Sequence, residues 1–332
     1  MMSFITLNRP PEPDAEIPDR SPGWSEGPRH ILLRGLGVLW LVDGLLQMQP
    51  GMFTMDMVSN IMQPAATGEP TWLSGLIGWS IHVVTPHLVP FNWGVVVLQL
   101  LIGTLLLMPR ERLVRSGLRL SVVWGLTVWL FGEGLGQLFT GTATFLTGAP
   151  GSVLLYVVAS VLLLLPGERW PRPRRDKGLD AATWTVSLTL ILGGLLQLSP
   201  VFWTGLGLSA PFGSGAMMPQ PPWIRQTLSA AASAAMSAPW AVNGVIVVML
   251  LGLGMLLILR PSCRWVLWAT LGWLAVTWWF GQDLGMIFGG MATDPNTAPM
   301  LAVLLWAGWT PRSGKRPRPS QGFIHPNAAR TT

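Results

Sequence analysis

Two acidic residues, Asp43 and Glu133, lie inside long apolar segments, and each is followed four residues later by a glutamine, Gln47 and Gln137. A carboxylate in an apolar or lipid environment is costly, and such residues usually serve binding or transport. Residues four apart on a helix share one face, so each acid and its glutamine should point the same way. The pattern predicts a polar pocket suited to a quinone headgroup, a proton or a cation.

The depth of the two acids in their segments supports a shared pocket. At 1.5 Å per residue, Asp43 would lie roughly 18 Å and Glu133 roughly 20 Å along its helix, so both fall in the outer half. The alternative is plain hydrogen bonding between helices, with a carboxylate close enough to the surface to be hydrated. The neighbouring glycines, Gly132, Gly134 and Gly136, suit close helix packing equally well.

An internal duplication gives a second version of this region. The twenty residues 131–150 return at 280–299, at an offset of 149, with ten identities. A shorter motif, GLLQMQP at 44–50, recurs as GLLQLSP at 194–200, at an offset of 150. Two markers at nearly one offset indicate that a whole unit was doubled.

The second repeat differs from the first at the acidic positions. It has Gly193 in place of Asp43 and Gln282 in place of Glu133, while it keeps Gln197 and adds Asp283. Gln197, Gln282 and Asp283 therefore join the candidate pocket residues, and the first repeat is the better candidate site.

A methionine run offers a different chemistry. Met52, Met55 and Met57 lie just after the first apolar segment, and thioether sulfurs select Cu(I). The alternative, which we favour, is an interfacial helix that uses methionine as flexible apolar filler.

The composition requires a lipid environment for these groups. Of 332 residues, 50% are hydrophobic and only 11% are charged, against about 25% charged in soluble domains. Nineteen tryptophans fit membrane interfaces. Because only helices satisfy their own backbone in lipid, we predict eight transmembrane helices. They are Ile31–Gln49, Trp93–Met108, Leu120–Phe139, Ser152–Leu165, Ala182–Ser199, Val242–Leu259, Trp265–Phe288 and Ala298–Trp309.

Charge placement predicts the topology. Under this assignment, every one of the 21 basic residues except Arg225 falls on one side, which the positive-inside rule makes cytoplasmic. We therefore expect a multi-pass protein of the cytoplasmic membrane with both termini in the cytoplasm. Each repeat has an even number of spans, so the fold class is all-α, with two tandem four-helix bundles in parallel orientation.

Four regions follow from this assignment. They are a disordered cytoplasmic tail at 1–28, a first membrane repeat at 29–178, a second at 179–311 and a basic cytoplasmic tail at 312–332. The outer connections, 50–92 and 200–241, are too long and apolar for plain loops. We expect helices at Trp72–Val84 and Trp223–Met236 that lie on the outer leaflet or dip into it, and Pro86, Pro90 and Pro239 should end them.

Several classes of function lack support. There is no P-loop or HExxH motif, and the basic residues form no nucleic-acid face. A single cysteine excludes an internal disulfide framework. In the loop Ala292–Pro299, Asp294 precedes a proline and is read as a turn residue.

The opening segment carries a family resemblance. The pattern Leu33-Arg34-Gly-Leu-Gly37, then Asp43-Gly44 and Gln47, then a proline and a long outer segment, resembles DoxX-like membrane proteins. The resemblance implies a four-helix membrane bundle in each half, at about 29–170 and 180–311. Some DoxX-like proteins are linked to thiosulfate:quinone oxidoreductases, which implies a redox role.

The leading hypothesis is an integral membrane accessory subunit without catalysis of its own, which anchors a redox partner or offers it a quinone site. The expected partners are the lipid bilayer and other membrane or redox subunits, with no nucleic acid. The expected cofactor is a quinone, with copper as the less favoured choice. One alternative is a transporter for copper or a small solute, and another is a structural membrane scaffold.

Overall fold

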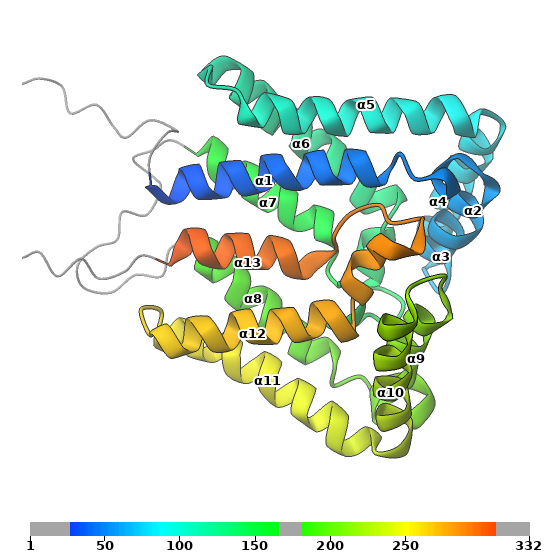
Figure 1. The fold of residues 1–332 in the computed structure, drawn as a ribbon, viewed down its shortest axis with the longest axis vertical. Coiled ribbons are helices and arrows are strands. Elements are labelled where there is room, and N and C mark those ends of the chain that lie inside the picture. Colours follow the sequence, from blue (N-terminus) through cyan, green and yellow to red (C-terminus); the bar gives the residue numbers. More distant parts are fainter. Residues whose placement is uncertain (1–26, 166–180, 310–332) are drawn as a thin grey trace, which may run out of the picture.

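The computed structural model describes residues 27–165 and 181–309, and every regular element within these ranges is a helix (Figure 1). The first repeat contains α1 (Gly27–Leu46), η1 (Pro50–Phe53), α2 (Met55–Met57), η2 (Val58–Met62), α3 (Gln63–Ala66), α4 (Thr71–Val84), η3 (Thr85–His87), α5 (Leu88–Leu107), α6 (Glu111–Phe131), η4 (Gly134–Gln137), η5 (Phe145–Thr147) and α7 (Ser152–Leu164). The second contains α8 (Ala181–Leu196), η6 (Pro200–Trp203), α9 (Gly205–Met217), α10 (Pro222–Ser237), α11 (Pro239–Leu259), α12 (Arg264–Phe280), η7 (Asp283–Gly289) and α13 (Thr297–Gly308). The tail predicted at 1–28, apart from its last two residues, and the tail at 312–332 lie outside the described residues.

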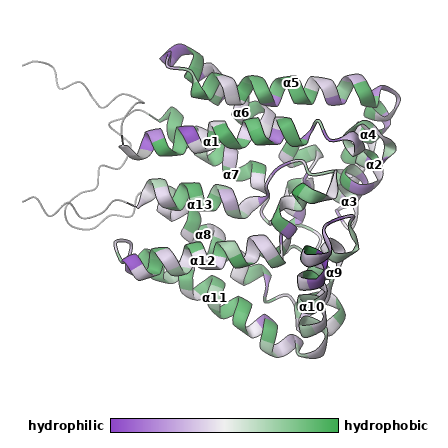
Figure 2. Cartoon of the chain, viewed as in Figure 1, coloured by the Kyte–Doolittle hydropathy of each residue, from purple (hydrophilic) through white to green (hydrophobic). Residues whose placement is uncertain are grey.

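Three helical stretches in the described ranges are long and apolar enough to cross a membrane. They are Thr71–Leu107, with 37 residues, Glu111–Phe131 and Pro239–Leu259, with 21 residues each. Hydrophobic residues predominate along α5 and α11 (Figure 2). On length and composition, the chain is therefore a helical membrane protein.

The duplication is visible in the backbone. After the third long helix of each repeat, the chain makes the same left-handed turn. Leu135 has φ/ψ angles of 54° and 33° and Gly136 has 69° and 21°, while Leu284 has 53° and 29° and Gly285 has 70° and 20°. The two turns are 149 residues apart, as the sequence alignment requires.

These turns correct one prediction about the site. The third helices were expected to run to Phe139 and Phe288, but α6 ends at Phe131 and α12 at Phe280. Consecutive residues with positive φ follow, and a right-handed helix of L-residues cannot continue through them. Glu133 and Gln137 therefore do not share a helical face, and that part of the prediction is wrong.

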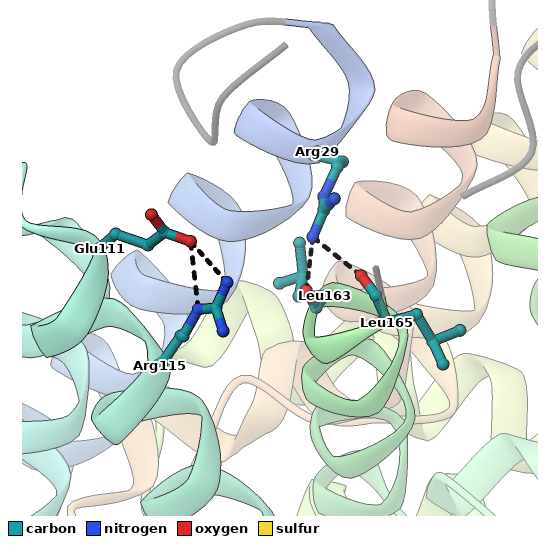
Figure 3. Close-up of polar contacts among 5 residues, drawn as sticks. All are labelled: Arg29, Glu111, Arg115, Leu163 and Leu165. Carbon is teal, nitrogen blue, oxygen red and sulfur yellow. Dashed lines mark hydrogen bonds and ion pairs between the residues drawn. The ribbon is translucent and has the colours of Figure 1, made fainter. Parts of the chain in front are cut away.

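One end of the bundle gathers many of the described basic residues. Arg29, at the start of α1, donates to the carbonyl oxygens of Leu163 and Leu165 at the end of α7, at 2.6 and 3.2 Å (Figure 3). At the same end, Arg115 pairs with Glu111 at 2.6 Å. The start of α1 and the end of α13 both lie at this end (Figure 1).

Shorter helices cover the opposite end. Figure 1 shows α9 and α10 lying across the direction of α11, α12 and α13. Helices were predicted in both long connections, and α4 and α10 confirm them. Pro86 lies in the short turn after α4, and Pro239 begins α11, as expected. Pro90 instead lies in the first turn of α5, where a proline leaves no helical hydrogen bond unmade.

The connections after α6 and α12 reach across to the opposite repeat. Ser199, after α8, donates to the carbonyl of Gly141 in the first repeat at 3.0 Å. Gln49, after α1, donates to the carbonyl of Ile287 in the second repeat at 3.1 Å. We call these two connections the crossing loops, residues 138–151 and 287–296. Each crossing loop helps to build the interior of the other repeat.

Candidate functional site

Asp43 is the most deeply buried acid in the described part of the first repeat. It is 1% exposed near the end of α1, and the hydroxyl of Tyr156 on α7 donates to its Oδ1 at 3.3 Å. Tyr156 is fully buried and packs edge-on against Trp40, with ring centroids 5.1 Å apart. It is also the only tyrosine in the chain. A carboxyl group buried this way needs a proton or a cation to compensate its charge.

Glu133 lies just beyond the end of α6, where the left-handed turn begins. Its Oε1 accepts from the hydroxyl of Ser152 at 2.8 Å and from the backbone N–H of Val153 at 3.3 Å. Both donors belong to the first turn of α7, where free N–H groups favour a carboxylate. Its Oε2 is buried and has no hydrogen-bond partner in the described structure. Gly151 makes room for it, since a Cβ there would overlap this oxygen.

A third acid, Asp294, comes from the crossing loop of the second repeat. Asp294 interacts electrostatically with both Asp43 and Glu133. Its Oδ1 accepts from the N–H of Asn296 at 2.6 Å, which confirms the predicted turn role. The sequence analysis predicted only the turn role of Asp294. Nothing in the local pattern shows that the loop crosses to the other repeat.

These groups adjoin a cavity of about 290 Å³ at the end of the bundle covered by the short helices. Glu133, Ser152 and Asp294 line it, together with Gln137 and Asn60, whereas Asp43 is not on its wall. The wall therefore combines the first repeat, the outer connection and the crossing loop of the second repeat.

The predicted glutamines of the two first helices form matching clamps. Gln47 donates to Asn92 Oδ1 at 2.6 Å, and Asn92 donates back to the Gln47 carbonyl at 3.0 Å. Gln197 and Asn243 repeat this arrangement at 2.8 and 3.2 Å. Because both repeats keep the clamp, we assign it to holding α1 on α5 and α8 on α11. The sequence analysis missed the two asparagines, although they are 151 residues apart.

The other three predicted residues have separate contacts. Gln137 donates to the carbonyl of Pro64 at 2.9 Å and ties the turn to the outer connection. Gln282 donates to the carbonyl of Phe145 at 3.3 Å and accepts from the N–H at the start of α13. Asp283 is 6% exposed and accepts from Gln220 at 3.2 Å, in the second repeat. Of the seven predicted residues, the structure brings Asp43, Glu133 and Gln137 to the cavity or next to it.

The place of the pocket in the second repeat is filled. The counterparts of Asp43, Glu133 and Asp294 are Gly193, Gln282 and Phe145, at offsets of 150, 149 and 149. Phe145 is fully buried, and its ring packs so closely on Gly193 that a Cβ there would lie 2.8 Å from the Phe145 Cβ. An aromatic ring thus occupies one repeat where carboxylates meet in the other.

Hydroxyl groups extend inward from the pocket along α7. Ser152, Tyr156 and Ser160 lie four residues apart and therefore share one face. Ser160 donates to Ser121 on α6 at 2.8 Å, and Ser121 accepts from the Trp40 indole, also at 2.8 Å. The equivalent helix α13, TAPMLAVLLWAG, has no hydroxyl after its first residue. The four-residue spacing was the signal that could have revealed this face.

Glu69 is a further acid that the sequence analysis did not single out. It precedes α4, is 8% exposed, and both its carboxylate oxygens lack a partner in the part of the chain described. Burial raises the pKa of the Glu69 carboxyl above its ordinary value. Gly134 lies against it, which places Glu69 behind the turn that carries Glu133.

The three methionines predicted as copper ligands have different surroundings. Met52 and Met57 are buried in an apolar cluster with Val84 and Leu88, while Met55 is 56% exposed. This arrangement favours the apolar-filler interpretation. Among the described residues, no group of three or more His, Cys, Asp or Glu side chains could hold a metal ion.

Comparison of the chain with family models, with curated proteins and with solved structures found no match in any of the three. The fold and the site therefore identify only the class of protein, which is a helical membrane protein with an internal duplication and an acidic pocket.

Proposed function

We propose that this chain is an integral membrane binding subunit whose acidic pocket, in the first repeat, takes a small polar ligand from the extracytoplasmic side. In this proposal, eight helices cross the cytoplasmic membrane as two parallel DoxX-like bundles, and both termini face the cytoplasm. The ligand pocket serves a partner complex, and the redox role implied by the family resemblance makes a respiratory complex the first choice. The chain has no catalysis of its own.

One observation carries this proposal: the two repeats share their structural contacts but not their acids. The glutamine–asparagine clamps and the left-handed turns occur in both repeats. Asp43, Glu133 and the tyrosine-bearing face of α7 occur in one only. If these polar groups were needed for folding, the second repeat, which adopts the same arrangement, would need them too. Their restriction to one repeat supports a role in binding.

The proposal predicts that Asp43→Asn and Glu133→Gln lose a co-purifying ligand while membrane expression stays normal. Both changes keep the size of the side chain and replace a carboxyl group by an amide that cannot ionise, so at least a tenfold loss of ligand occupancy is expected. Native mass spectrometry of the purified full chain measures occupancy and identifies both the ligand and any partner subunit. Asp283→Asn removes an acid of the second repeat and should change nothing. Wild-type occupancy in both pocket variants would refute the proposal.

A second candidate function is transport, and the hydroxyl face of α7 favours it. Ser152, Tyr156 and Ser160 carry polar groups from the pocket toward the middle of the bundle. Such a face could pass protons or a small solute.

The transport candidate predicts proton or solute flux in proteoliposomes that falls at least tenfold in Tyr156→Phe, which removes only the hydroxyl. Thr185→Val is the matched control, because the Thr185 hydroxyl bonds only within its own helix, to Ala181. Equal flux through wild-type protein, Tyr156→Phe and empty vesicles would eliminate transport.

A further inference from the structure

The acidic pocket of the first repeat has three carboxyl groups and no described basic side chain paired with them. Asp43, Glu133 and Asp294 come from three separate segments and repel one another. None of the three forms an ion pair with a described basic residue. Three converging carboxyl groups without a cation are unfavourable unless protons or a positive ligand compensate them.

One carboxylate oxygen points to a missing donor. Glu133 lines the cavity, and its Oε2 is buried without a hydrogen-bond partner among the described residues. A buried unpaired acceptor costs stability, so a ligand that donates to it gains that free energy on binding. A donor with positive charge gains most, because charge-assisted hydrogen bonds are the stronger kind.

The hydroxyl donors of the wall are already used within the protein. Ser152 donates to Glu133, Thr293 to Asp294, and Thr147 to the Thr144 carbonyl. With these hydroxyls used, the buried unpartnered side-chain atom of the wall is the acceptor Oε2 of Glu133, and a complementary ligand supplies a donor to it. A quinone offers only carbonyl acceptors and matches this wall poorly.

The size of the cavity favours an organic cation over a bare metal ion. A volume of about 290 Å³ is close to the lower limit of typical ligand pockets. No described group of His, Cys, Asp and Glu side chains has the arrangement to hold a metal ion. A small organic molecule with one ammonium group fits both the volume and the acceptors.

The second repeat limits the number of sites. Phe145 fills the space beside Gly193, and Gln282 replaces the acid that Glu133 supplies in the first repeat. At the position equivalent to the pocket, the second repeat therefore has neither the acids nor the space for a cation.

We infer that the pocket binds one small organic ammonium ion per chain, held by Glu133 and Asp294 over the buried Asp43. This inference rests on the proposed function and names its ligand class. The crossing loop of the second repeat supplies one of the carboxylates, so both repeats build the site.

The experiment is isothermal titration calorimetry of the full chain in detergent micelles with butylammonium, and with 1-butanol as the neutral probe of similar size. Saturable binding of one butylammonium per chain is expected, with no binding of butanol. Glu133→Gln and Asp294→Asn should each weaken binding at least tenfold. An asparagine at 294 still accepts the turn hydrogen bond, which protects the fold. Asp283→Asn should bind as the wild type does.

Each other outcome has a defined meaning. Butylammonium binding that is equal in wild type and Glu133→Gln, or two sites per chain, would overturn the inference. A short-chain quinone that binds in place of butylammonium, and is lost in Glu133→Gln, would overturn the ligand class but keep the proposed pocket. If neither probe binds and no small molecule co-purifies with the wild type, both the inference and the proposed function fail.

Discussion

Replacing Gly136 by alanine is expected to prevent stable folding of the first repeat. Gly136 has a φ of 69°, and an added Cβ would overlap the carbonyl oxygen of Pro150. The neighbour is backbone, so it cannot rotate away as a side chain could. The overlap adds to the strain of a left-handed alanine, and we expect a loss of more than about 4 kcal/mol, which is exceptional for one substitution.

Gly141→Ala is the matched control for Gly136→Ala. Gly141 also has a positive φ, 76°, but nothing lies within 4 Å of an added Cβ. Gly141→Ala should lower stability only by roughly 1–2 kcal/mol, which is the cost of placing alanine in the left-handed conformation. Expression and detergent-resistant folding, measured side by side, compare the two variants. Equal stability of the two would show that the turn does not approach Pro150 as described.

Phe145→Ala should produce the second large effect. Phe145 is fully buried at the contact between the repeats, where it packs on Gly193. Truncating a buried phenylalanine to alanine typically costs about 3–5 kcal/mol, because the cavity left behind is only partly refilled. We expect a loss in this range, although the acids of the first pocket are untouched.

Reversible unfolding in detergent mixtures measures the effect of Phe145→Ala. Phe139→Ala in the same crossing loop is the control, since Phe139 is 57% exposed and should change stability by less than about 1 kcal/mol. A stability loss in Phe145→Ala no larger than that in Phe139→Ala would contradict the interpretation that Phe145 fills the place of the pocket in the second repeat.

The helices and the duplication were predictable because they depend on local pattern. Apolar runs located α7 and α11 to within three residues, whereas α5 begins at Leu88, five residues before its predicted start. The ends of α6 and α12 were missed, since the apolar pattern continues through the turn while the backbone changes hand at Leu135 and Leu284. The hydropathy of a residue indicates whether its side chain prefers an apolar environment. It carries no information about the sign of the backbone angle φ.

The sequence by itself determined a helical membrane protein built twice from one unit, and it singled out Asp43 and Glu133 as acids that only one repeat carries. Only the tertiary structure decided that Asp294 joins them, that Phe145 fills the other repeat, and that Gln47 belongs to a structural clamp. The physical reason is distance along the chain. A pattern of hydropathy reports each helix separately, whereas a pocket depends on which loops cross, and packing between the two repeats sets that crossing.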